Sequence, residues 1–237
     1  STLVIFVLIP LTVYVGIHYW NDYNFMLVSV LILLYVMAPF FMMFERKKPR
    51  ARELVLVAVM TALTALGNIV CYITIPFQAG TAMAIVSGIA LGPEAGFLVG
   101  ALARFLCNFF LGQGPWTPWQ MLAFGVAGLV AGLLADVRVF PRANLSWPRR
   151  IALATVGFVL IVGLVGPILD TSTFFYLSTA PTPELAAVVY LAGLPVNAIH
   201  GAATALTLLV VANPLLDQLA RVRVKYGLLD RSRPNCP

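Results

Sequence analysis

The sequence predicts an all-α protein, a polytopic bundle of membrane-spanning helices, and three observations lead to this fold class. Of the 237 residues, 61% are hydrophobic and only 10% are charged, whereas soluble domains are about 45–50% apolar and about 25% charged. The hydropathy is high over nearly the whole length, in stretches that suit membrane spans. The basic residues gather between these stretches, and Arg104 is the exception. We therefore expect a multi-pass protein of the cell membrane.

The first two spans, 3–20 and 24–44, are predicted to form an N-terminal hairpin, residues 1–44. The turn between them is aromatic and lacks Lys and Arg, which is typical of the non-cytoplasmic interface. A basic linker, residues 45–52, follows the hairpin. The positive-inside rule places this linker in the cytoplasm.

Six further spans are predicted to form a core, residues 53–212. They cover residues 53–74, 81–92, 95–112, 119–135, 151–169 and 184–212. The segment 170–183 is expected to be an external loop, because it is polar, aromatic and free of Lys and Arg. The basic segment 137–150 and the basic tail 213–237 are expected on the inner side. Both termini are therefore predicted to be cytoplasmic, with the tail on the membrane surface.

The helix predicted over 53–74 has two different faces when residues are placed at about 100° intervals. Ala58 and Ala62 belong to a smooth alanine stripe, which suits close contact with another helix in lipid. Asn68 and Tyr72 belong to a polar stripe, which needs a protein or ligand partner inside a membrane. The span 119–135 has a small-residue packing face of its own, made of Ala123, Gly125, Ala127, Gly128, Ala131 and Gly132.

Polar groups in the outer halves of the spans predict a ligand pocket that faces outward. Arg104 is a formal charge within a span, and such a charge usually faces a bundle interior or an aqueous cavity. The other expected pocket residues come from spans and loops: Asn68, Tyr72, Gln78, Asn108, Trp116, Trp119, Asn197 and His200. Their amides and aromatic rings suit a polar, partly aromatic solute, either neutral or with an anionic group near Arg104.

Each of these residues also has a purely structural interpretation. Arg104 can be a buried arginine held by backbone carbonyls, and intramembrane Asn and His often only link helices. Trp116 and Trp119 can be interface anchors. An integral membrane enzyme and a structural membrane protein are therefore the alternatives of a different class.

Several motifs with known chemistry are absent from the sequence. No GxxxxGK(S/T) phosphate loop occurs, so ATP binding by such a loop is not expected. No HExxH or GxSxG motif occurs, and the three cysteines form no CxxC pair. Neither catalysis, nor a metal site, nor a cofactor is therefore predicted. The basic residues lack an element that reads nucleic acid, so a nucleic-acid partner is not expected either.

Four features together carry a resemblance to a known family. These are six spans after a basic segment, the AxxxA element of Ala58 and Ala62, the LGPEAG turn at 91–96, and GQGPWTPWQMLAFGVAGLVAGLLA at 112–135. Over residues 51–212 the chain resembles the substrate-binding S components of energy-coupling factor (ECF) vitamin transporters. The fold would then be a six-span S-component core with the hairpin 1–44 added to it.

The resemblance implies a membrane subunit that binds a vitamin from outside with high affinity. The 112–135 stretch is most similar to S components assigned to cobalamin (vitamin B12), and another vitamin or micronutrient is the alternative. The implied partners are a transmembrane coupling subunit and two cytoplasmic ATPase subunits. Ala58 and Ala62 would dock on the coupling subunit, and the loop 76–81 would cover the substrate.

Overall fold

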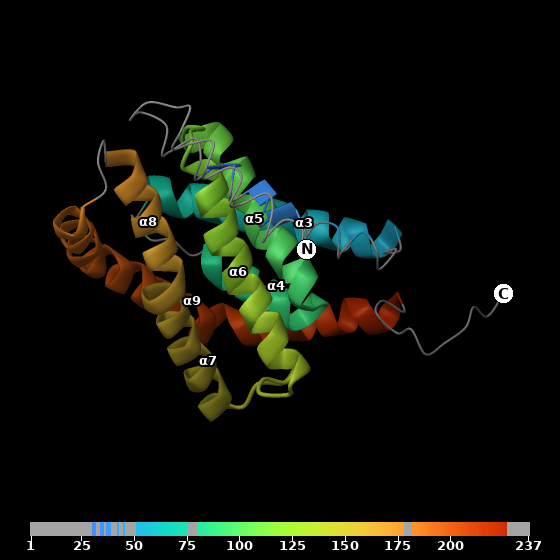
Figure 1. The fold of residues 1–237 in the computed structure, drawn as a ribbon. Coiled ribbons are helices and arrows are strands. Elements are labelled where there is room, and N and C mark those ends of the chain that lie inside the picture. Colours follow the sequence, from blue (N-terminus) through green and yellow to red (C-terminus); the bar gives the residue numbers. More distant parts are fainter. Residues whose placement is uncertain are drawn as a thin grey trace.

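The computed structural model describes residues 51–74, 80–177 and 182–226, together with isolated positions between 30 and 45. Over the three ranges the chain is helical and contains no strand. The helices are α3 (Ala51–Thr74), α4 (Gly80–Leu91), α5 (Pro93–Leu111), α6 (Thr117–Asp136), α7 (Trp147–Leu160), α8 (Gly166–Leu177) and α9 (Pro183–Lys225) (Figure 1). A π-helical segment, Ile161–Val165, joins α7 to α8 without a break. The predicted hairpin 1–44 and most of the loop 76–81, including Gln78, lie outside the described residues.

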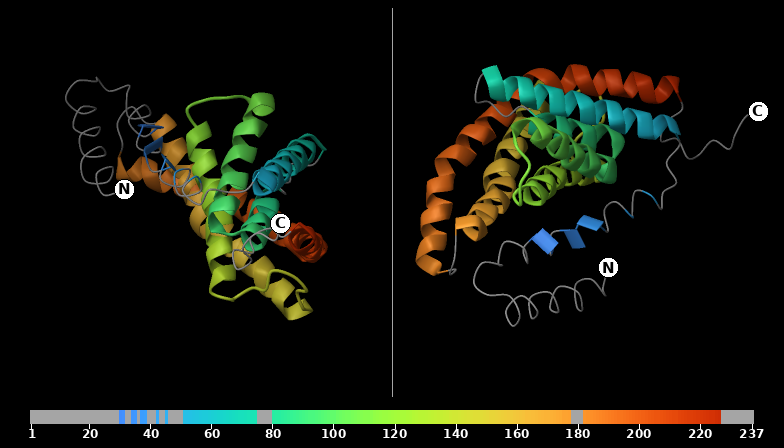
Figure 2. Two further views of the ribbon diagram at one scale, coloured as in Figure 1. Left: turned by 90° about the vertical axis from the view of Figure 1, so that its right-hand side faces the viewer. Right: turned by 90° about the horizontal axis from the view of Figure 1, so that it is seen from above.

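The predicted polytopic helical bundle is confirmed. Five helical stretches of the described part are long and apolar enough to cross a membrane, and α4 is a shorter apolar helix of 12 residues. In α4 every residue except Met83 is buried. The helix contacts both α3 and α9, and Figure 2 shows that α3 and the C-terminal half of α9 run roughly parallel. Because protein surrounds α4 on several sides, this helix need not match the thickness of the bilayer.

The external loop was predicted to begin at residue 170, but the helix α8 continues to Leu177. No Gly or Pro occurs between residues 168 and 180, so nothing in the sequence stops the helix there. The Thr171 and Thr173 hydroxyls donate to the carbonyls of Pro167 and Leu169 at 2.7 and 3.2 Å. These polar side chains are therefore satisfied within the helix.

The last helix is longer than the predicted span 184–212. It continues to Lys225 as a single helix of 43 residues, so the first half of the predicted tail is helical. Pro195 and Pro214 lie inside it without ending it. Proline is tolerated inside membrane helices where neighbouring groups satisfy the freed backbone carbonyls.

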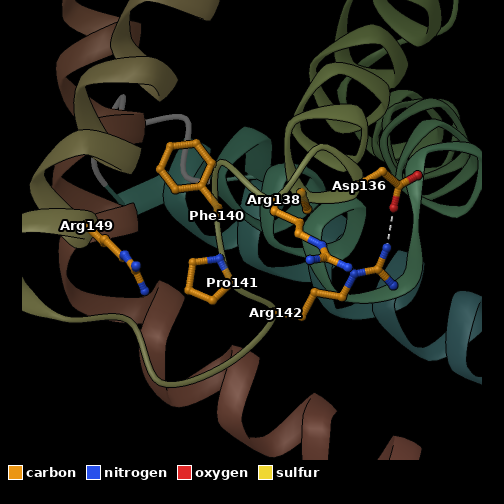
Figure 3. Close-up of a pocket in the computed structure, with 7 residues that line it drawn as sticks. Asp136, Arg138, Phe140, Pro141, Arg142 and Arg149 are labelled. Carbon is orange, nitrogen blue, oxygen red and sulfur yellow. Dashed lines mark hydrogen bonds and ion pairs between the residues drawn. The ribbon is translucent and has the colours of Figure 1, made fainter.

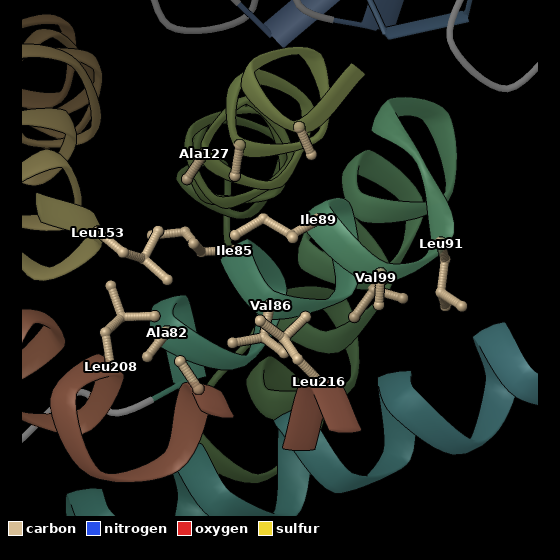
Figure 4. Close-up of a cluster of buried hydrophobic side chains, with 14 of the residues drawn as sticks. Ala82, Ile85, Val86, Ile89, Leu91, Val99, Ala127, Leu153, Leu208 and Leu216 are labelled. Carbon is tan, nitrogen blue, oxygen red and sulfur yellow. The ribbon is translucent and has the colours of Figure 1, made fainter. Parts of the chain in front are cut away.

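The hydrophobic core lies where α4 meets α5, α6, α7 and α9 (Figure 4). Ile85 and Ile89 of α4 are almost fully buried there, together with Leu153 of α7 and Leu208 of α9. The most extensive helix contacts are those between α5 and α6, followed by those between α4 and α6. The three helices α4, α5 and α6 therefore form the tightest part of the bundle.

Glycines allow α4, α5 and α6 to approach one another this closely. A Cβ atom added at Gly88 or Gly96 would collide with the main chain of Gly128, and one added at Gly128 would collide with the main chain of Gly96. A Cβ atom added at Gly132 would likewise collide with the main chain of Pro93. The small-residue face predicted for 119–135 is therefore confirmed as a packing face, with its alanines buried as well.

Replacing Gly128 with alanine tests this packing. We expect Gly128→Ala to destabilise the protein by about 1–3 kcal/mol, because the added methyl group forces α5 and α6 apart. Thermal unfolding in detergent, followed by circular dichroism, measures the change. Gly67→Ala is the matched control, since a Cβ at Gly67 meets nothing within 4 Å. Equal midpoints for the two variants would contradict the proposed role of Gly128.

Candidate functional site

Arg104 lies at the centre of a polar and aromatic cluster at one end of the bundle. Its Nε donates a hydrogen bond to Gln120 Oε1 at 3.1 Å. The guanidinium carbon lies 4.9 Å from the centre of the Phe124 ring, within the range of a cation–π interaction. Both partners belong to α6, one turn apart, so the contact between α5 and α6 positions the cation.

Asn108 lies one turn further along α5 and links it to the start of α6. Its side-chain amide donates to Thr117 Oγ1 at 2.9 Å and to Gln120 Oε1 at 2.8 Å. Thr117 in turn donates to Gln113 Oε1 at 3.0 Å. Asn108 is buried, and both hydrogens of its amide are used within the protein. It orients Gln120, which accepts from Arg104 and Asn108 together.

His200 of α9 joins the cluster through the same aromatic ring. Its ring lies 5.8 Å from that of Phe124, and its Nε2 is 3.0 Å from Thr81 Oγ1 at the start of α4. Arg104 is close enough to His200 to interact with it electrostatically. The ring of Phe124 therefore has a guanidinium and an imidazole as neighbours.

Aromatic residues at the start of α6 contact aromatic residues of α8. Trp119 stacks on Phe175 with 6.0 Å between the ring centres, and Trp116 meets Tyr176 edge to face at 5.9 Å. The Trp119 Nε1 is buried and has no hydrogen-bond partner. Buried donors without partners are uncommon, so this N–H is a candidate contact for a ligand.

The two polar residues predicted on α3, Asn68 and Tyr72, lie in different surroundings. Asn68 is 4% exposed, and its amide lies 3.7 Å from Cys107 Sγ of α5. It also packs against Gly80, where a Cβ atom would collide with it. Tyr72 is 56% exposed, yet it is near enough to Arg104 to interact with it electrostatically.

Asn197 does not share a described contact with the Arg104 cluster. Its amide donates to Asp170 Oδ2 of α8 at 2.8 Å, and its side chain packs against Gly166. The Asp170 carboxylate packs in the same way against Gly193 of α9. The pair therefore joins α8 to α9 at glycine contacts, which favours the structural interpretation for Asn197.

The structure thus brings Arg104, Asn108 and His200 together around Gln120 and Phe124. Trp116 and Trp119 contact aromatic residues of α8 instead, and Tyr72 interacts with Arg104 only electrostatically. Sequence reasoning missed Phe124, and it placed Thr81 in the covering loop although Thr81 lies at the start of α4. Phe124 follows Trp116 and Gln120 at helical spacing, which is the signal that could have placed it on the same face. Asp170 was assigned to a loop and lies in a helix.

Ala58 and Ala62 are both exposed on α3, on the side away from the buried Thr61 and Thr64. Large apolar side chains surround them on the same exposed surface: Leu54, Val55, Val59, Leu63 and Leu66. The alanine stripe is thus a shallow strip within an apolar face that no described element covers.

Comparison with known proteins identifies the family. A family model described as "ECF-type riboflavin transporter, S component" matches residues 48–221. The chain belongs to this family. Members are components of transporters and not enzymes, so the resemblance to ECF S components is confirmed. The narrower prediction of a cobalamin-type S component has no support, since the family's description names riboflavin.

The chain is also similar to several curated UPF0397 proteins. A UPF0397 protein of Lactococcus lactis subsp. cremoris is 31% identical over 143 residues, which cover 59% of this chain and 71% of the relative. A UPF0397 protein of Vibrio atlanticus is 29% identical over 137 residues, covering 54% of this chain and 71% of the relative. One from Aliivibrio fischeri is 34% identical over 89 residues, covering 35% and 48%. No solved structure matches the chain.

A double-mutant cycle tests the pairing of Asp170 with Asn197. We expect Asp170→Ala and Asn197→Ala each to lower stability, because each leaves a polar partner unpaired inside the bundle. The coupling between them should be about 1–2 kcal/mol, measured by thermal unfolding in detergent. Strictly additive effects of the two substitutions would contradict the pairing.

Proposed function

We propose that the chain captures a water-soluble vitamin with a planar heteroaromatic ring at the end of the bundle that carries the Arg104 cluster. Riboflavin, named in the description of the family, is the first candidate. The observation that carries the proposal is the position of Arg104 and His200 beside the ring of Phe124. A ring with carbonyl groups on one edge can stack on such side chains while it accepts hydrogen bonds from the guanidinium.

The cluster also offers groups that can exchange their present contacts for a ligand. Gln120 accepts from both Arg104 and Asn108, so a ligand carbonyl can replace it as the acceptor for Arg104. The unpaired Nε1 of Trp119 can donate a further hydrogen bond. The resemblance to ECF S components further suggests that the loop 76–81 covers the ligand.

Transport requires partners that supply energy, because the sequence has no phosphate loop for ATP. The proposed partners are a transmembrane coupling subunit and two cytoplasmic ATPase subunits, as family membership implies. The exposed alanine strip of α3 is the proposed docking site for the coupling subunit, because small residues permit close helix contact in lipid. The basic segment 137–150 and the end of α9 would face the cytoplasm.

Calorimetric titration of the purified protein with riboflavin, cobalamin and a panel of other vitamins tests the ligand. We expect riboflavin to bind and Arg104→Ala to weaken its binding at least tenfold, about 1.4 kcal/mol, since a hydrogen bond to a charged group is lost. Phe110→Ala is the matched control on the same helix, because Phe110 is 76% exposed on the lipid-facing side. Tight binding of cobalamin or another vitamin in place of riboflavin would show that the proposed ligand is wrong. Unchanged affinity of the Arg104→Ala variant would show that Arg104 has a structural role and does not bind the ligand.

Replacing Ala62 with tryptophan tests the docking site. We expect Ala62→Trp to abolish co-purification of the coupling subunit and vitamin uptake by cells, because the large side chain keeps the helices apart. Binding of the vitamin to the isolated chain should stay unchanged. Ala187→Trp, at an exposed alanine of α9, is the control and should behave like the unchanged protein. Normal uptake by the Ala62→Trp variant would rule out this face.

A further inference from the structure

A cavity of about 520 Å³ lies at the opposite end of the bundle from the Arg104 cluster. It is open to the outside of the protein and is bordered by the end of α6, the loop 137–146 and the start of α7 (Figure 3). Its lining residues are Ala135, Asp136, Arg138, Phe140, Pro141, Arg142 and Arg149. The proposed transport function uses none of them.

The cavity carries an excess of positive charge. Three arginines and one aspartate line it, and the aspartate, Asp136, is already paired with Arg142. Figure 3 shows that Arg149 comes from α7, whereas Arg138 and Arg142 come from the loop. The guanidinium groups of Arg138 and Arg149 form no hydrogen bond or ion pair with any residue that the structure describes. Two guanidinium groups are thus available to an anion.

Arg223 of α9 adds a fourth guanidinium next to this site. It is close enough to Arg142 for the two positive charges to repel each other. Its Nε is buried and has no hydrogen-bond partner. A buried charged donor without a partner is costly, and clustered like charges add to that cost. A bound anion would offset both.

The loop that holds these arginines is fixed in place by α9. The backbone N–H of Asn144 donates to Asp217 Oδ1 at 2.8 Å, and that of Leu145 donates to Asn213 Oδ1 at 2.7 Å. Phe140 and Leu145 are buried beneath it. The cavity is therefore formed before any ligand binds, which lowers the entropic cost of binding.

We infer that this cavity binds a phosphate group, and that the source is the headgroup of an anionic phospholipid in the inner leaflet. Guanidinium groups bind phosphate oxygens in pairs of parallel hydrogen bonds, so the available arginines match this chemistry. The positive-inside rule puts this end of the bundle at the cytoplasmic surface, where anionic lipids attract basic residues. Trp147, two residues before Arg149 at the start of α7, is 62% exposed, as expected at the headgroup level.

Native mass spectrometry of the full chain in detergent tests the inference, with short-chain phosphatidylglycerol and phosphatidylcholine as probes. We expect phosphatidylglycerol to bind preferentially, and the double variant Arg138→Ala/Arg149→Ala to weaken its binding about tenfold. Arg221→Ala is the matched control, since Arg221 is exposed on α9 and does not line the cavity. Equal binding of the two lipids to the unchanged protein, or equal binding of phosphatidylglycerol to both proteins, would overturn the inference.

A competition experiment with inorganic phosphate distinguishes a lipid headgroup from a soluble phosphate as the ligand of the cavity. If millimolar phosphate displaces bound phosphatidylglycerol and raises the thermal midpoint as much as the lipid does, a soluble phosphate is the ligand and the lipid assignment is wrong. If phosphate has no such effect, the lipid headgroup is supported. The variants Arg138→Lys and Arg149→Lys retain charge without the paired geometry, and they provide folded comparisons should the alanine variant unfold.

Discussion

Main-chain contact at glycines holds α4, α5 and α6 together, and the rest of the bundle depends on it. Lipid tails are as apolar as leucine, so burial of apolar surface does not draw these helices together, and close packing has to do so. Gly96 and Gly128 bring α5 and α6 into direct contact. That contact also places Arg104 within hydrogen-bond distance of Gln120. The packing of the bundle and the geometry of the candidate site therefore share one physical cause.

Most of the architecture could be predicted from the sequence, because hydropathy and charge report directly on membrane spans. The helices predicted for the six core spans and the small-residue face of 119–135 are all present in the structure. The ends of α8 and α9 could not be predicted. Hydropathy falls after residue 169 and after residue 212, but both helices continue. In α8 the threonine hydroxyls bond within the helix, and in α9 the buried Leu216 and Leu219 continue its packed face.

The site was predictable in its residue types but not in its partners. Asn197 and His200 lie three residues apart on α9, yet Asn197 bonds to α8 and His200 to α4. Only the positions of the neighbouring helices decide this, and no pattern in one sequence reports them. The chemistry divides accordingly between the two ends of the bundle. Aromatic rings and amides surround one cation at one end, and several arginines share a cavity at the other.

The π-helical segment between α7 and α8 affects how this protein can evolve. A π turn arises when one residue is inserted into an α-helix, and each residue turns the helix by about 100°. The extra residue in Ile161–Val165 therefore sets the rotational phase of α8 relative to α7. The directions in which the side chains of Asp170 and Phe175 point then depend on the number of residues in this segment as well as on residue identity. A single-residue deletion could redirect this whole face without altering any side chain on it, a change that substitution scanning would never sample.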